Sequence, residues 1–128
     1  MGRIVRPVRF GSEDGSVWVA ADAAIDTGST HCQIPESVAA QLHARVHRRS
    51  RVRLADGRMI ERDIVIVLLD LDPALAPLQT LAVVGGEGSP FLIGVVPLEQ
   101  MGVGLDPSGD RLIPVIDDLL GMTEWRTV

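Results

Sequence analysis

The sequence predicts an all-β fold with one or two short helices, and three observations point to it. Hydrophobic residues make up 46% of the 128 residues but aromatic ones only 3%, so the core is built from aliphatic, largely β-branched side chains that suit strands. Thirteen glycines and eight prolines supply the turns of a strand-rich chain. Short apolar or alternating runs recur between those turns. This length fits one domain, placed at residues 1–116, with residues 117–128 as a tail of unassigned structure.

The expected elements follow from these runs and the turns between them. They are, in order, strands over 4–10, 17–25 and 31–34, a helix over 35–42, strands over 51–54, 59–69, 78–84 and 91–94, a helix over 97–101, and strands over 103–105 and 112–115.

Proline and charge positions justify the first elements. Pro7 favours an edge position for the first strand, because proline cannot donate a hydrogen bond to a sheet. The second strand is apolar at its end and delivers Asp26. Pro35 suits a helix start because amides of the first turn have no partner in the helix, and Glu36 suits the positive end of the helix.

A hairpin is expected in the middle of the chain. Residues 51–54 alternate as a strand with one solvent-facing side, and Asp56-Gly57 is a typical turn between two such strands. The returning strand ends in the continuous apolar run 64–69, and residues 78–84 form another buried strand.

Glycines mark the last elements. Residues 85–90 are a glycine-rich loop, the next strand ends in Gly94, and the following helix stops near Gly102. Residues 106–109 form a turn between the last two short strands.

Charge and cysteine content narrow the function classes. A formal net charge of -5 argues against general nucleic-acid binding. The single cysteine, Cys32, cannot form an intrachain disulfide, which is compatible with a reducing compartment. No apolar run is long enough to span a bilayer, and the first residues lack the apolar core of a secretion signal. We therefore expect a cytoplasmic protein whose partners include neither nucleic acid nor membrane.

Histidine and cysteine side chains do not form a recognisable reactive or metal-binding pattern. Cys32 follows His31 directly, and neighbouring residues of a strand point to opposite faces, so we interpret Cys32 as a buried structural thiol. The three histidines lack the spacing and the companions of a metal site. We expect neither a metal nor a cofactor.

The most basic part of the chain runs from Arg45 to Arg53. It suggests an acidic partner or nucleic acid, but it contains no aromatic residue that could stack on bases. We favour a solvated loop that leads into a half-exposed strand.

Residues 24–29, Ala-Ile-Asp-Thr-Gly-Ser, carry the chemistry. An ionised aspartate at the end of an apolar strand is costly unless something solvates or pairs it. Gly28 allows a tight turn and Thr27 offers a hydroxyl. Alone, Asp-Thr-Gly also fits an ordinary turn at a strand end. Three further pieces follow it in order, namely Ile34-Pro35 before a helix, the Asp56-Gly57 hairpin, and Phe91-Leu92-Ile93-Gly94 before a helix and Gly102.

This order of motifs over residues 18–115 resembles the retropepsin-like, single-lobe aspartic proteases, here of a bacterial type. The resemblance implies a closed, barrel-like lobe and an aspartic endopeptidase without a cofactor. It also implies site residues: the catalytic Asp26; the active-site loop Thr27, Gly28, Ser29 and Thr30; the substrate-covering flap Leu54, Ala55, Asp56, Gly57, Arg58 and Met59; and the loop support Leu92, Ile93 and Gly94.

A single Asp-Thr-Gly has a consequence for assembly. Hydrolysis of a peptide bond by this chemistry uses two close carboxylates, and no other Asp-Gly in the chain has an apolar strand before it. A two-fold dimer would supply the second carboxylate from the partner's Asp26. We therefore expect a homodimer that hydrolyses peptide substrates.

The sequence departs from the viral members of this family at two positions, and functions other than peptide hydrolysis remain open. Viral members often carry an acidic residue and an arginine where this chain has Thr30 and Val95, which affects dimer strength and specificity more than the carboxylate pair. The same fold could serve as a catalytically silent peptide-binding or dimerisation module. Alternatively, the arginine-rich stretch could be the working surface of a regulatory protein, or tune a protease toward acidic substrate side chains.

Overall fold

The computed structural model describes residues 3–109 and 111–117. This part contains the strands and helices β1 (Arg3–Gly11), β2 (Trp18–Asp26), β3 (Cys32–Pro35), α1 (Glu36–Gln41), β4 (Arg45–Arg53), β5 (Met59–Asp70), β6 (Leu78–Gly85), β7 (Phe91–Ile93), α2 (Val95–Met101), β8 (Val103–Leu105) and β9 (Leu112–Pro114). The predicted all-β fold with short helices is confirmed. Residues 118–128 lie outside the described residues, so the division into a domain and a tail stays a prediction.

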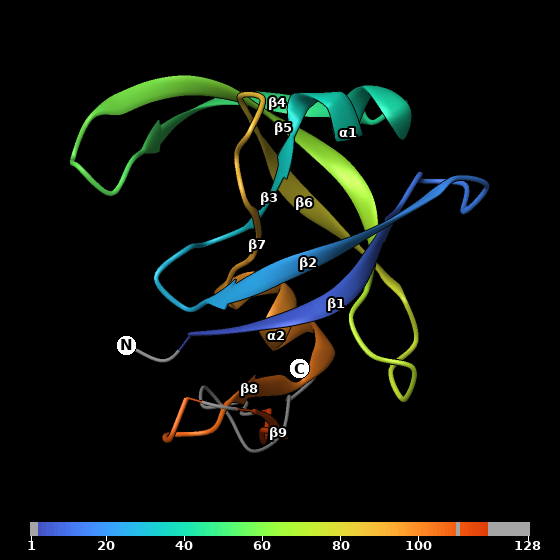
Figure 1. The fold of residues 1–128 in the computed structure, drawn as a ribbon, viewed down its shortest axis with the longest axis vertical. Coiled ribbons are helices and arrows are strands. Elements are labelled where there is room, and N and C mark those ends of the chain that lie inside the picture. Colours follow the sequence, from blue (N-terminus) through green and yellow to red (C-terminus); the bar gives the residue numbers. More distant parts are fainter. Residues whose placement is uncertain (1–2, 110, 118–128) are drawn as a thin grey trace, which may run out of the picture.

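The large sheet closes into a barrel-like ring (Figure 1). Its strand order is β1-β2-β7-β3-β6-β5-β4, and β1 also pairs with β5 through residues 9–11 and 68–70. Pro7 lies in the part of β1 that β5 does not reach, which is the edge position that the sequence predicts. The ring encloses the aliphatic core expected from the composition, with fully buried side chains that include Phe10, Ile25, Ile34, Val67 and Ile93.

The β4–β5 hairpin leaves this ring as a long arm (Figure 1). Its turn is closed by the Leu54 amide, which donates to the Arg58 carbonyl at 2.8 Å, and Gly57 adopts a φ of +89°. The Asp-Gly hairpin is thus confirmed. The solvated loop expected at the start of the arginine-rich stretch is wrong, because β4 begins at Arg45. An edge strand keeps one side free of partners, so it tolerates a dense row of charges.

The order of β2, β7 and β3 determines where the site can form. β7 lies between β2 and β3, parallel to β2 with Ile25 opposite Ile93, and antiparallel to β3 with Gln33 opposite Leu92. The loop between β2 and β3 is therefore held next to the end of β7 and the start of α2. Helix α2 begins at Val95, two residues before the predicted start, because Pro97 can occupy the first helical turn without losing a hydrogen bond.

The β8–β9 hairpin forms a separate two-stranded sheet after α2. No helix within the described ranges is long and apolar enough to cross a membrane.

Candidate active site

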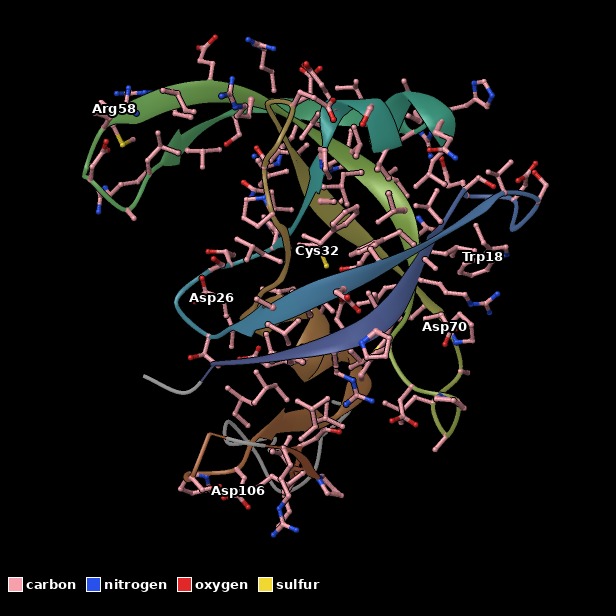
Figure 2. All side chains as sticks on the ribbon, in the orientation of Figure 1. Trp18, Asp26, Cys32, Arg58, Asp70 and Asp106 are labelled. Atoms are coloured by element: carbon pink, nitrogen blue, oxygen red, sulfur yellow. The ribbon has the colours of Figure 1, made fainter. Side chains whose placement is uncertain are left out.

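Asp26 stands where strand β2 leaves the core. Ala23 and Ile25 are fully buried, whereas Asp26 is half-buried and Thr27 is exposed. Figure 2 shows Asp26 where β2 passes into the β2–β3 loop, at one edge of the barrel. The apolar strand thus carries a carboxylate to the point at which solvent or a partner can reach it.

Two donors of the same loop hold the Asp26 carboxylate. Its Oδ1 accepts the Gly28 amide at 3.0 Å, and its Oδ2 accepts the Ser29 hydroxyl at 3.2 Å. The Ser29 amide also donates to the Asp26 carbonyl at 3.0 Å. A carboxylate has about four lone-pair sites, so these two side-chain bonds orient both oxygens and leave capacity for a water or a second carboxyl group.

The start of α2 fixes the loop from below. The Val95 amide donates to the Ser29 carbonyl at 2.8 Å, and the Val96 amide donates to the Thr30 carbonyl at 3.0 Å. These amides belong to the first helical turn, where the helix itself supplies no acceptor. The loop therefore uses donors that would otherwise lack a partner in the protein.

Gly94 permits this close approach. A β-carbon at this position would lie 2.5 Å from the carbonyl oxygens of both Ser29 and His31. Ile93 is fully buried, and Leu92 is half-buried. The structure thus brings the three residues expected to support the loop against β2, β3 and the loop itself.

The turn of the β4–β5 hairpin projects on the same side of the barrel as the Asp26 loop (Figure 2). Residues 55–59 are exposed, and Leu54 is half-buried. Asp56 accepts the Arg58 amide at 2.9 Å and its guanidinium at 2.8 Å, and these bonds lower the pKa of Asp56. Among the described residues, no hydrogen bond or ion pair joins this turn to the Asp26 loop.

The two faces of the hairpin differ in burial. Opposed residues of an antiparallel pair share a face, and Val52 lies opposite Ile60. Both are half-buried, whereas Arg53 and Met59, the next opposed pair, are exposed. The face that carries Val52 and Ile60 therefore turns toward the body of the protein.

A groove of about 420 Å³ lies beside Thr27, and the sequence pattern did not indicate it. Its lining is mostly apolar and comes from α2, β8 and residues 115–117, and it also includes the acidic residues Glu99 and Asp117. Ile116 is 86% exposed and Val115 is 44% exposed. Only the assembled fold shows that the β8–β9 hairpin lies next to the Asp26 loop.

Cys32 is confirmed as a buried thiol. It is fully buried and free, and burial raises its pKa to about 12. A thiol in this state is a poor nucleophile. Within residues 3–109 and 111–117, no three histidine, cysteine or acidic side chains gather as metal ligands.

Comparison with known proteins agrees with this geometry over most of the chain. The sequence model of a family described as aspartyl protease matches residues 7–96, a span that includes the Asp26 loop, the β4–β5 hairpin and Gly94. Searches of curated proteins and of solved structures found no match.

Proposed function

Because the chain belongs to the aspartyl protease family, we propose that it is a homodimeric aspartic endopeptidase in which each subunit supplies one Asp26 to a shared pair of carboxylates. The observation that carries this proposal is the setting of Asp26. Its two oxygens are oriented by the Gly28 amide and the Ser29 hydroxyl, directly after the buried residues 23–25 of β2.

The chemistry requires two carboxyl groups in different protonation states. Close carboxylates repel each other, so the pair retains one proton over a range of pH. The ionised member takes a proton from water as the water attacks the peptide carbonyl, and the protonated member gives its proton to the carbonyl oxygen. The tetrahedral intermediate then collapses, the C–N bond breaks, and the leaving nitrogen takes up a proton.

Two features support assembly through a two-fold axis near the Asp26 loop. Thr27 and Gly28 are exposed, so a second copy can approach this loop. The mostly apolar groove beside Thr27 and the exposed Ile116 provide the surface that such an approach would bury. Burial stabilises by about 25 cal/mol per Å² of apolar surface, so an exposed isoleucine favours a covered state. In an isologous two-fold dimer, each subunit would contribute its own copy of this groove to the interface.

The β4–β5 hairpin would act as the flap over an extended substrate. Its half-buried face carries Val52, Leu54 and Ile60, which offer apolar contacts to substrate side chains. Peptides that bind as an added strand use backbone hydrogen bonds for affinity and side-chain pockets for specificity. Closure would exclude water other than the attacking molecule. A cytoplasmic location is part of the proposal, and the free thiol of Cys32 agrees with it.

Incubation of the purified protein with a peptide library, from acidic to neutral pH, tests the proposal. We expect cleavage products by mass spectrometry with the native chain and none with Asp26→Asn, which keeps the shape and size of the side chain. Cleavage that persists in Asp26→Asn would rule out the proposed chemistry. Peptide binding by a native dimer without cleavage would point instead to a silent binding module.

A further inference from the structure

The β4–β5 hairpin is a basic arm on an acidic protein. Residues 45–63 contain seven of the twelve arginines but only three of the seventeen carboxylates of the whole chain. The rest of the chain, outside residues 45–63, therefore has five arginines and fourteen carboxylates. Such a separation of charge creates a local positive potential at the flap.

Most of the arginines on this arm lack an acidic partner. Arg45 pairs with Glu13, Arg58 pairs with Asp56, and Arg49 pairs with two acidic residues of β5. Four others make no side-chain hydrogen bond or ion pair with any described residue: Arg48, Arg51, Arg53 and Arg62.

Two of these unpaired arginines lie on the face of the hairpin that turns toward the body of the protein. In β5, Arg62 alternates with Ile60 and Ile64, so the three share a face. Arg48 of β4 lies opposite Ile64, as Val52 lies opposite Ile60, and so belongs to the same face. Arg62 is half-buried, which means that this charge is partly removed from water without a compensating carboxylate.

His31 adds an imidazole group. It follows the Asp26 loop and precedes β3, and its Nδ1 is buried without a hydrogen-bond partner among the described residues. Burial and the positive charge of Arg48 lower the pKa of His31. His31 lines a cavity together with Ile66 and His47.

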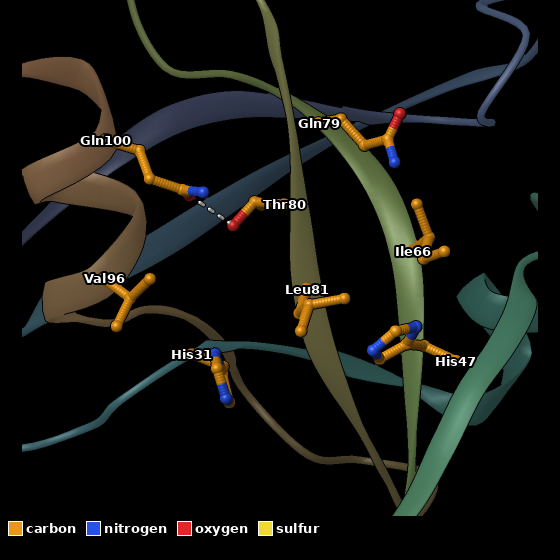
Figure 3. A pocket seen from close by; sticks show the side chains of 8 residues that line it. All are labelled: His31, His47, Ile66, Gln79, Thr80, Leu81, Val96 and Gln100. Carbon is orange, nitrogen blue, oxygen red and sulfur yellow. Dashed lines mark hydrogen bonds between the residues drawn. The ribbon is translucent and has the colours of Figure 1, made fainter.

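A cavity of about 290 Å³ lies further along the same face of β5 (Figure 3). Ile66 lines it and is the next residue after Ile64 on that face of β5. Amide, imidazole and hydroxyl groups provide its polar lining, and no carboxylate takes part. The lining residues are His31, His47, Ile66, Gln79, Thr80, Leu81, Val96 and Gln100.

We propose that the basic face that carries Arg48 and Arg62, together with the cavity lined by His31, binds an acidic segment of the substrate polypeptide. This inference rests on the proposed peptidase function and names its substrate class. The exposed Arg48 and the half-buried Arg62 share a face of the hairpin that continues to this cavity through Ile64 and Ile66. Guanidinium groups without an acidic partner among the described residues fit carboxylate side chains, which arginine binds through two parallel hydrogen bonds.

A polypeptide fits this face better than a nucleic acid does. Residues 45–63 contain no aromatic side chain on which bases could stack. The fourteen carboxylates elsewhere on the chain would repel a long phosphate backbone, whereas a short run of acidic side chains contacts the arm alone.

The chain offers a matched control for the role of this face. Arg51 and Arg53 lie on the same strand as Arg48 and also lack partners among the described residues, but they occupy the opposite, exposed face. Charges on an edge strand can also serve only to prevent association with the sheet of another molecule. In that case, arginines on either face of the hairpin would contribute equally to peptide binding.

Binding of labelled peptides to the full chain carrying Asp26→Asn tests the proposal without requiring cleavage. The probes are a rhodamine-labelled peptide of alternating alanine and glutamate, the same peptide with glutamine for glutamate, and a rhodamine-labelled oligothymidylate. Fluorescence anisotropy reports binding. We expect the glutamate peptide to bind about tenfold or more tightly than the glutamine peptide, with weaker binding as salt rises.

The double variants then locate the site. We expect Arg48→Gln/Arg62→Gln to lose about tenfold in affinity for the glutamate peptide, and Arg51→Gln/Arg53→Gln to lose no more than about threefold. Arg48→Lys/Arg62→Lys, which keeps the charge but not the paired hydrogen bonds, should fold like the native chain and lose less affinity than Arg48→Gln/Arg62→Gln. Equal binding of the two peptides, equal losses in the two glutamine variants, or tighter binding of the oligothymidylate would overturn the proposal. Because the readout is binding, a lack of peptidase activity would not imitate any of these results.

Discussion

The α-carbon of Gly94 lies against the backbone of Ser29, so that a β-carbon at residue 94 would be 2.5 Å from the Ser29 carbonyl oxygen. The same carbonyl accepts the Val95 amide at 2.8 Å. The loop that orients Asp26 is therefore held by backbone contacts from a distant part of the chain. These contacts are possible because residue 94 is a glycine and has no β-carbon.

Gly94→Ala should damage the site by moving this loop. The added methyl group meets backbone atoms that cannot rotate away, so we expect a loss of about 1–3 kcal/mol in the free energy of unfolding. Peptide cleavage by the folded fraction should fall as well. Chemical denaturation and cleavage assays measure the two effects. Gly86→Ala is the control, because a β-carbon at residue 86 would have nothing within 4 Å among the described residues. Equal stability of the two variants would refute the close approach.

Ser29→Ala should reduce turnover more than stability. It removes the hydroxyl that donates to Asp26 Oδ2 at 3.2 Å, so one oxygen of the carboxylate loses its orientation. The stability cost of such a hydrogen bond is about 0.5–1.5 kcal/mol. Ser37→Ala is a matched control, because the Ser37 hydroxyl donates to Glu87 at 3.0 Å on the exposed side of α1. If the two variants had the same kcat/KM, Ser29 would have no part in orienting Asp26.

Much of the fold could be predicted from local signals in the sequence. The Asp56-Gly57 turn, the apolar run of β5 and the strand that ends at Gly94 each combine a periodic pattern with a specific turn residue. The arginine-rich stretch could not be predicted as a whole strand. Over residues 45–50 the charged residues do not alternate with apolar ones, and pairing with β5 rather than burial makes this part a strand.

The relation between residues on different strands was not accessible from the sequence. The Asp26 loop and Gly94 could be predicted from their motifs. The hydrogen bonds that the amides of α2 donate to this loop could not be predicted. The shared face of Arg48 and Arg62 depends on the register between β4 and β5, which shifts between Val46 and Arg48. A shift of one residue moves a side chain to the other face, and no local pattern indicates it.

Cys32 should resist thiol reagents in the folded protein. Burial raises its pKa to about 12 from 9.0, so the thiolate is rare at neutral pH and the sulfur is shielded. We expect iodoacetamide to modify Cys32 only under unfolding conditions, as followed by intact-mass spectrometry. Because the folded pKa is raised, stability should fall as pH rises from about 9 toward about 12. Rapid modification of the native protein would contradict the buried placement.

Asp14 should contribute stability that is lost in acid. Hydrogen bonds from the side chain and amide of Ser16, and from the Ser12 hydroxyl, lower its pKa from 3.8 to about 2. A depressed folded pKa means that the contribution is complete above the unfolded value of 3.8 and disappears as pH falls through about 2. Carbon-13 NMR of the carboxyl group measures this pKa directly. Asp14→Asn should show a smaller loss of stability over the same pH window, and an unchanged loss would contradict the assignment.

The central claim, that two copies of Asp26 form one active site, is tested most directly by mixing subunits. Native chain and Asp26→Asn are unfolded together, refolded and assayed for peptide cleavage at a fixed total concentration. If activity requires both carboxylates, random pairing in an equal mixture leaves about a quarter of the native activity, because only the native homodimer is active. Retention of about half, the value for chains that each act alone, would contradict the shared site.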